Sequence, residues 1–257
     1  MKERKAQEQR AIEDLIPMVP REIKYVQAKL DRLRRVADFP DDASILDIGA
    51  AHGLFVAACQ ELGYRSCGIE PWDEARANAL RLSEHLSVQL SIVKGIAEDM
   101  PFDNETFHVV HANSVLEHVV DLEASLSEVF RVLKPGGVFW FSTASSVCPF
   151  QEEISGFPLF GWYPHKLKLR IMYWAKEHKP ELIGHTQFPA VHWFTPWYAR
   201  RILTTHGARK VYDRWDIRGE NEGGSVYRWM LKTIRMNRVS KLMADVLMPG
   251  CSYAAIK

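Results

Sequence analysis

The sequence of 257 residues lacks several features that mark whole classes of protein. Its four cysteines include no C-x-x-C pair and no zinc-ligand spacing, so we expect buried free thiols in a reducing compartment. No apolar run reaches the length of a membrane span, and the charged start, MKERKAQEQR, is unlike a signal peptide. We therefore predict a cytoplasmic protein without a transmembrane segment.

The chain also lacks an excess of charge of one sign. Its formal net charge is +1 at pH 7, whereas a domain that binds nucleic acid is usually strongly basic. We therefore predict that nucleic acid is not a partner. A hydrophobic content of 47% is typical of a globular protein, and the length suits one α/β domain with additions or two small domains.

In the first half of the chain, short apolar runs alternate with segments of helical length. Such alternation is typical of an α/β protein with a parallel sheet. Proline and glycine in LKPGG, residues 133–137, predict a sharp turn from helix to strand. The expected strands are 45–49, 65–70, 88–94, 107–112 and 137–143, and the expected helices are 53–62, 73–84 and 121–133.

The two ends and the middle of the chain have different patterns. Apolar residues at helical spacing predict helix over residues 1–38. Residues 144–195 break the alternation, and the 49 residues 150–198 contain 12 of the 28 aromatic side chains. A segment this long and this aromatic suits a lid or an acceptor pocket better than an ordinary connection. Further on we expect helix 196–206, strand 209–215, helix 226–247 and a last strand, SYAAI.

The expected helix 226–247 is amphipathic, with apolar residues largely on one side and lysine and arginine outside that set. The pattern favours packing against the sheet or against a neighbouring subunit. Peripheral contact with an anionic membrane surface is the alternative.

The turn after the first expected strand, ILDIGAAHG, has fewer glycines than a dinucleotide-binding turn. The G-x-G-x-x-G fingerprint requires glycine at 49, 51 and 54, and this chain has Ala51 and Leu54. Pyrophosphate disfavours a nearby carboxylate such as that of Asp47. S-adenosylmethionine carries an ammonium and a sulfonium group and no phosphate, so the same carboxylate favours it. Glu70, at the end of the next strand, suits the two hydroxyls of a ribose.

Four segments together resemble the class I S-adenosylmethionine-dependent methyltransferases: LDIGAAHG, GIEP, GIAEDMPFDNETFHVVHANSVLEHV and VLKPGG. The chain is most similar to the group that includes ubiquinone-pathway O-methyltransferases and many sugar and lipid methyltransferases. The resemblance covers roughly residues 43–143, and HWFTPWYARRILTTHGA resembles a later segment of the group. It implies a Rossmann-like, mostly parallel seven-stranded sheet flanked by helices, with S-adenosylmethionine as the cofactor.

The resemblance also implies roles for individual residues. Gly49 and Gly53 are expected to let the backbone approach the methionine part, which Asp47 helps to orient, and Glu70 is expected to bind the ribose. Further contacts to the adenine and the methionine are expected from Pro71, Trp72, Ala97, Glu98 and Asn113. The chain departs from the family pattern at two positions. Ala51 replaces a glycine, which we interpret as a mild change, and Ile96 stands where relatives often have an aspartate.

Two histidines are candidates for catalysis. His118, in NSVLEHV, follows the fourth strand, where the acceptor approaches in the family, and an imidazole can take a proton from a hydroxyl. His192, before WFT, is the second candidate; for both, a structural role is the alternative. Some relatives hold a divalent metal with two carboxylates and this histidine. Here Ser114 replaces the first carboxylate and leaves Glu117 and His118, so we predict no metal.

We therefore predict an enzyme that transfers a methyl group from S-adenosylmethionine to a small-molecule or lipid- or sugar-type acceptor, at oxygen. The expected organisation is a single domain with a helical N-terminal cap (1–42), a cofactor-binding core (43–143), an aromatic insert or lid (144–195) and a C-terminal part (196–257). A nicotinamide-dependent reductase or epimerase and a non-catalytic cofactor-binding module are the alternatives. The oligomeric state does not follow from the sequence.

Overall fold

The structure of the chain is a computed structural model that describes residues 12–150, 153–183 and 188–257. It divides into two compact units. Unit 1 comprises the chain up to Asn113 together with Asp121–Trp140 and Ile256–Lys257, and unit 2 comprises Ser114–Val120 and Phe141–Ala255. The single-domain organisation stays a prediction.

Seven strands of the described ranges form one sheet in the order β3-β2-β1-β4-β5-β7-β6. β1 pairs in parallel with β2 and with β4, and β2 pairs in parallel with β3. This confirms the predicted Rossmann-like, mostly parallel seven-stranded sheet. The strand order changes direction beside β1, and ligands of open α/β sheets bind at such a switch point. The strands are β1 (Ser44–Ile48), β2 (Arg65–Ile69), β3 (Ser91–Val93), β4 (Phe107–Asn113), β5 (Leu133–Thr143), β6 (Lys210–Asp213) and β7 (Cys251–Ile256).

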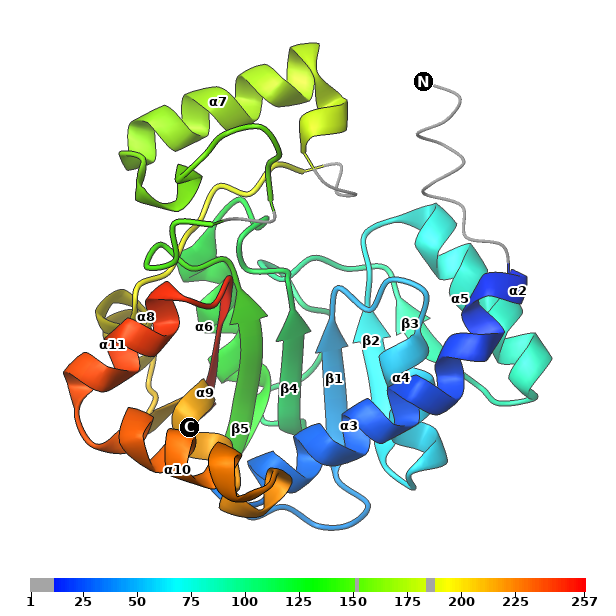
Figure 1. Cartoon of the computed structure of the whole chain (residues 1–257). Coiled ribbons are helices and arrows are strands. Elements are labelled where there is room, and N and C mark those ends of the chain that lie inside the picture. Colours follow the sequence, from blue (N-terminus) through cyan, green and yellow to red (C-terminus); the bar gives the residue numbers. More distant parts are fainter. Residues whose placement is uncertain (1–11, 151–152, 184–187) are drawn as a thin grey trace. The chain divides into compact units, whose positions relative to one another are not determined.

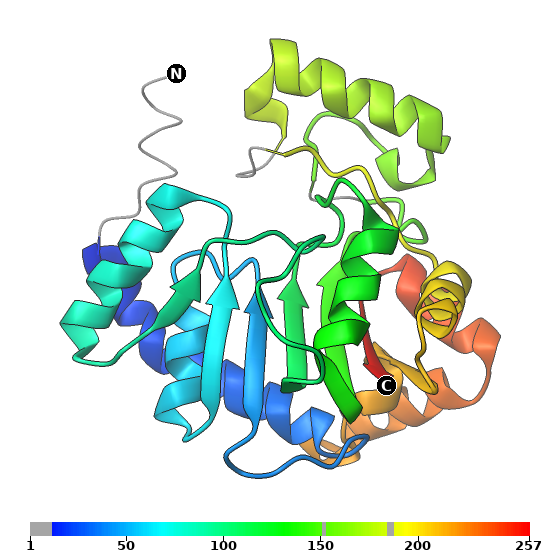
Figure 2. The ribbon, with the colours of Figure 1, turned by 180° about the vertical axis from the view of Figure 1, so that it is seen from behind.

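The helices of unit 1 cover both faces of its strands. Figure 1 shows α3 and α4 on one face, and Figure 2, from behind, shows α6 on the other. α3 turns the apolar side of its helical pattern inward and buries Val26, Leu30 and Leu33. The helices are α2 (Ile12–Leu15), the 3₁₀ turn η1 (Ile16–Met18), α3 (Val19–Leu33), α4 (Leu54–Glu61), α5 (Asp73–Leu86) and α6 (Leu122–Val132).

The helix predicted over residues 1–38 ends earlier in the structure than expected. Residues 1–11 lie outside the described residues, and α3 already ends at Leu33. Beyond that point Arg34 donates to the carbonyl of Phe39 at 2.7 Å and pairs with Asp41 at 2.9 Å, which folds the chain back on the helix end.

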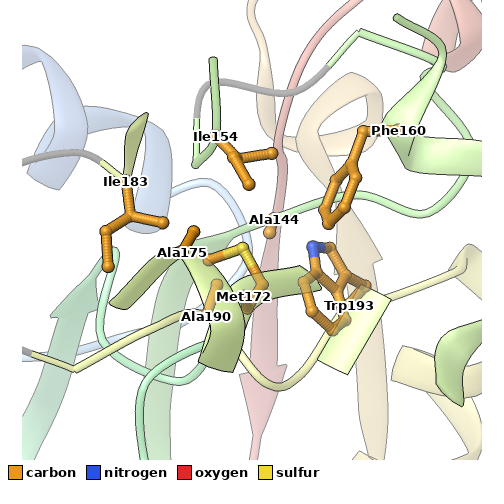
Figure 3. Packing of buried hydrophobic residues seen from close by; sticks show 8 residues of the cluster. All are labelled: Ala144, Ile154, Phe160, Met172, Ala175, Ile183, Ala190 and Trp193. Atoms are coloured by element: carbon orange, nitrogen blue, oxygen red, sulfur yellow. The ribbon is translucent and has the colours of Figure 1, made fainter. Parts of the chain in front are cut away.

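In unit 2, residues of the aromatic insert pack around a small hydrophobic core (Figure 3). Met172 and Ala175 of α7 contribute to it, and the other members are Ala144, Ile154, Phe160, Ile183, Ala190 and Trp193. Whether this segment opens as a lid stays a prediction. The helical elements of unit 2 are η2 (Phe160–Trp162), α7 (His165–His178), η3 (Pro180–Leu182), α8 (Pro196–Thr205), α9 (Arg214–Ile217), η4 (Glu220–Glu222), α10 (Ser225–Arg235) and α11 (Arg238–Val246).

Three further predicted boundaries are wrong, one because of pairing with a distant segment and two because a local side chain caps a helix. LKPGG belongs to β5 rather than to a turn, since Gly136 donates to the carbonyl of Lys257 and Lys257 donates to that of Gly137. β6 ends at Asp213, whose side chain caps α9. The predicted helix 226–247 is two helices, because the side chain of Asn237 caps a new one, α11.

Candidate cofactor and acceptor sites

The turn after β1 has a backbone that favours glycine. Gly49, Ala51 and Gly53 have positive φ angles of 70°, 46° and 80°. The N–H groups of Gly49 and of the next residue both donate to the carbonyl of Ile69, at 2.9 and 3.0 Å, which holds the turn against the end of β2. Ala51 therefore takes a left-handed conformation in which its methyl group costs free energy.

Glu70 lies beside this turn and is 6% exposed. One of its oxygens, Oε2, accepts from the N–H of Ala51 at 2.9 Å, and the other, Oε1, accepts from that of Trp72 at 3.1 Å. Burial raises the pKa of this carboxyl, and the two N–H groups oppose the rise. Each oxygen keeps a further acceptor position, so the carboxylate can accept from the two hydroxyls of a ribose. The Glu70 carboxylate therefore fits its predicted role of binding the ribose.

The remaining predicted cofactor residues of unit 1 follow the ends of β2, β3 and β4. Pro71 and Trp72 are half-buried, Ala97 is buried and Asn113 is exposed at the end of β4. Oε1 of Glu98 accepts from the N–H of Asp121 at 3.3 Å, at the start of α6. Ile96, at a position where relatives often have aspartate, is 48% exposed and offers an apolar surface instead of a hydrogen-bond acceptor.

Asp47 is oriented by a buried polar chain. Its Oδ1 lies 2.6 Å from Nδ1 of His111, and Nε2 of His111 lies 2.6 Å from Nζ of Lys29. The ring of His111 stacks between those of Phe55, at 3.8 Å, and Trp140, at 5.0 Å. At least one oxygen of Asp47 is thus committed to His111, and contact of Asp47 with the cofactor stays a prediction.

Burial changes the pKa of every titratable member of this chain. It lowers the pKa of Lys29 to about 7, although Asp47 opposes the change. Burial also raises the pKa of Asp47 well above its ordinary value and lowers that of His111 well below its own. Nζ of Lys29 lies 3.6 Å from the centre of the Trp140 ring, so its protonated form contacts an aromatic face as well as the imidazole of His111.

In unit 2, Glu117 lies in the segment that follows Asn113 and is buried. Its Oε2 accepts from the hydroxyl of Thr143 at 2.8 Å, and its backbone carbonyl accepts from the N–H groups of Val191, at 2.7 Å, and His192, at 3.2 Å. Burial raises the pKa of this carboxyl to about 7. Glu117 therefore joins the segment of His118 to that of His192.

The two predicted catalytic histidines differ in what their rings contact. Nδ1 of His118 is buried and has no hydrogen-bond partner within the described residues. Burial lowers the pKa of His118, and the carbonyls of Phe188 and Pro189 oppose that change. Nε2 of His192 lies 3.0 Å from the carbonyl of Val119, so one of its nitrogens has a structural partner. Whether either ring takes part in catalysis stays a prediction.

Comparison with known proteins identifies the domain. Residues 46–141 match the family model of a methyltransferase domain. These residues form a class I S-adenosylmethionine-dependent methyltransferase domain. The match covers the glycine turn, Glu70 and Asn113, which are residues of unit 1.

Curated relatives of this methyltransferase act at different atoms. The mitochondrial ubiquinone biosynthesis O-methyltransferase of Bos taurus is 34% identical over 126 residues, which are 44% of this chain and 33% of the relative. The sterol 24-C-methyltransferase of Candida albicans is 33% identical over 105 residues, 38% of this chain and 27% of the relative. The matched segment is therefore about a third or less of these relatives' length.

Solved structures support the fold of this methyltransferase. The geranyl diphosphate C-methyltransferase from Streptomyces coelicolor, in complex with Mg²⁺, geranyl diphosphate and S-adenosylhomocysteine, has a TM-score of 0.56 at 17% identity. The comparison covers 91% of this chain and 79% of that one. In the described ranges of this methyltransferase, no three His, Cys, Asp or Glu side chains come together as metal ligands, and every helix is too short or too polar to cross a bilayer.

Sequence reasoning missed Lys29 and His111. One signal was available, since a histidine in the middle of the apolar strand FHVVHA is costly unless it has a polar partner. The register pairs Asp47 of β1 with His111 of β4. Lys29 could not be found in this way, because only the packing of α3 brings it to the imidazole.

Proposed function

We propose that this methyltransferase transfers the methyl group of S-adenosylmethionine to a small-molecule or lipid-type acceptor, at an oxygen atom. The observation that carries the proposal is the Glu70 carboxylate, buried and bound to two backbone N–H groups beside a glycine turn without a dinucleotide fingerprint. The relatives that act on ubiquinone precursors and sterols support an acceptor of this class.

The cofactor would be held by the residues that surround the turn. Glu70 would bind the ribose hydroxyls, and the left-handed Gly49 and Gly53 would let the backbone approach the methionine part. Pro71 and Trp72 would flank the adenine, with Ala97 and Glu98 against its edge. When bound, S-adenosylmethionine supplies a methyl group on a sulfonium, which an in-line nucleophile displaces. The protein's own contribution is then to orient the reactants and to exclude water.

A hydroxyl acceptor needs a group that takes its proton. His118 supports this role, because its lowered pKa keeps the ring neutral near pH 7 and its Nδ1 is buried without a partner in the described part of the chain. Glu117, with its pKa raised to about 7, is a second candidate, which leaves His192 the third. A positioned base contributes about 10²–10⁴-fold to a rate.

Titration calorimetry tests the cofactor. We expect binding heat with S-adenosylhomocysteine and none with NAD. Glu70→Ala removes charge-assisted hydrogen bonds worth about 1.5–3 kcal/mol each, so binding should weaken at least ~10-fold. Glu84→Ala, at an exposed position of α5, is the control and should bind normally. Heat with NAD alone would contradict the proposal, and normal binding by a folded Glu70→Ala variant would contradict the role of Glu70.

Product analysis tests the accepting atom. The protein is incubated with the cofactor and a panel of quinols, sterols and lipid-linked sugars, and mass spectrometry locates the added methyl group. We expect an O-methyl product, and His118→Ala should lower its formation at least ~10-fold while cofactor binding is retained. Exclusive methylation at carbon, as the name of the sterol relative describes, would contradict the oxygen assignment and leave the cofactor assignment intact. Location in the cytoplasm and the absence of a nucleic-acid partner stay predictions.

A further inference from the structure

Helices α10 and α11 turn an apolar face to solvent. In α10, Val226 (79% exposed), Trp229 (70% exposed) and Met230 follow the i, i+3, i+4 spacing of one helical face. In α11, Val239, Leu242 and Met243 repeat the same spacing and are also exposed. Met236, between the helices, and Leu247, after them, add to this surface. We call these eight residues the apolar face of the α10–α11 pair.

The opposite side of the pair is directed inward and is largely polar, although it also buries Leu231 of α10. Nζ of Lys241 donates to Oδ2 of Asp213 at 2.9 Å, and Oδ1 of Asp245 accepts from the indole N–H of Trp215 at 2.9 Å. The guanidinium of Arg235 donates to the carbonyl of Trp215 at 2.8 Å. These bonds hold the pair with its charged side inward and leave the apolar face outward, so the face is not covered by the sheet that the sequence pattern favoured.

Basic side chains outnumber acidic ones on the two helices, and one of them, Lys232, pairs with Glu220 of η4 at 3.6 Å. Residues 225–247 contain five lysines and arginines and one acid, and that acid, Asp245, is buried. Arg228, Lys232 and Arg238 are exposed on the two helices. An isologous contact with a second copy would bring this basic rim against itself, which is unfavourable. An anionic lipid surface instead matches both the apolar face and the basic rim.

We propose that the α10–α11 pair lies on an anionic lipid surface, with its apolar face in the boundary between headgroups and acyl chains. Helices with an apolar face that contains tryptophan, and with lysine and arginine beside it, bind membranes in this way. Trp229 suits that depth because its ring is apolar and its N–H can reach the headgroups. The proposal goes beyond methyl transfer and does not depend on it, since it rests on residues of unit 2 that have no role in the cofactor site.

Vesicle sedimentation tests the proposal directly. The full chain is mixed with vesicles of phosphatidylglycerol and phosphatidylcholine, and with vesicles of phosphatidylcholine alone. We expect binding to the anionic vesicles, weakened by high salt, and much less binding to the neutral ones. The triple variant Trp229→Ser, Val239→Ser, Met243→Ser should bind at least ~10-fold less. Because the three side chains are exposed, we expect it to fold, and its circular dichroism and melting temperature check this.

Charge variants separate the two parts of the recognition. Each basic residue near an anionic surface contributes about fivefold to binding, so Arg228→Glu with Arg238→Glu should lower binding at least ~25-fold. The matched control is Leu80→Ser, at an exposed apolar position of α5 in unit 1, which should bind like the parent protein. Equal binding by the parent and the triple variant would overturn the proposal.

If a second copy of the chain covers the apolar face instead of lipid, the protein should form dimers. Light scattering after size exclusion measures the mass of the parent and of the triple variant over a range of concentrations. A dimer that the triple substitution abolishes, together with no binding of the parent to anionic vesicles, would overturn the lipid proposal and assign the face to self-association. A monomer that does not bind the vesicles would overturn it too.

Discussion

Helix α3 and the α10–α11 pair have the same kind of amphipathic sequence and the opposite burial. α3 buries Leu30 and its apolar neighbours, whereas α10 and α11 expose most of their apolar residues, Trp229 and Met243 among them, and bury only Leu231 and Asp245. Helical periodicity identifies which residues share a face, but it does not say which way that face points. In the α10–α11 pair, polar partners such as Asp213 and Trp215 decide the direction, because a charge that finds partners inside the fold can be buried.

The first test compares a lysine from each helix. Lys29→Met removes the cation that ends the buried chain of Asp47 and His111 and leaves the carboxyl without it, which should cost about 3–5 kcal/mol of unfolding free energy. Lys232→Met, at an exposed position of α10, should change stability by no more than about 0.5 kcal/mol. Denaturant unfolding of both variants checks the difference. A loss for Lys29→Met as small as that expected for Lys232→Met would show that the buried chain contributes little to stability.

A second test compares two leucines. Leu30→Ala empties a fully buried site in α3 and should destabilise the protein by about 2–5 kcal/mol. Leu247→Ala removes a side chain that is 77% exposed, and its effect should stay within about 0.5 kcal/mol. Thermal unfolding of the two variants measures both changes in stability. A large loss for Leu247→Ala would mean that the apolar face is covered in solution.

Glu117 is also a buried titratable group, and it should make the stability of the protein depend on pH. Its pKa is raised from 4.5 to about 7 in the folded chain, so the folded state holds the proton more tightly than the unfolded one. As pH rises from 4.5 to about 7, the protein therefore loses stability, and above that range the loss is complete. At ~1.4 kcal/mol per pH unit, the loss between pH 5 and pH 8 is about 2–3 kcal/mol.

Glu117→Gln should not show this loss, because the amide does not titrate and still offers an oxygen to Thr143. Relative to the parent protein, it should therefore gain about 2–3 kcal/mol between pH 5 and pH 8, as measured by urea unfolding at both values. Glu84→Gln, at an exposed position, should follow the parent protein within about 0.5 kcal/mol. A parallel pH dependence of Glu117→Gln and the parent would rule out the raised pKa.

The smallest expected effect concerns the cofactor turn. Ala51 has a φ of 46°, and glycine adopts such a conformation without the cost that a methyl group imposes. Ala51→Gly should therefore stabilise the protein by about 0.5–1 kcal/mol, after allowance for the freer unfolded chain. Ala50→Gly, next in the chain, should destabilise it instead, since Ala50 is buried and has no positive φ. The melting temperatures of the two variants, compared with that of the parent protein, test whether the two changes have opposite signs.

Much of the unit 1 core could be predicted from the sequence, because its signals are local. Strands such as 107–112 are short apolar runs, and Glu70 follows one of them at a fixed distance from the glycine turn. LKPGG was predicted wrongly for the same reason, since its proline and glycines are local turn signals, and only the pairing of Gly136 and Gly137 with Lys257 keeps them in β5. The match of residues 46–141 to a methyltransferase family follows from these local motifs.

By itself, the sequence determined the α/β alternation, the glycine turn with its acidic partner and the family, because each depends on residues that are close together in the chain. The tertiary structure alone decided which buried groups meet. Lys29 reaches His111 only when α3 packs on the strands of unit 1, although 82 residues separate the two side chains. Likewise, α10 and α11 expose their apolar face only because Lys241 and Asp245 find partners about 30 residues earlier, at Asp213 and Trp215. Periodicity within a helix carries no information about such distant partners, and their hydrogen bonds determine which side of the helix is buried.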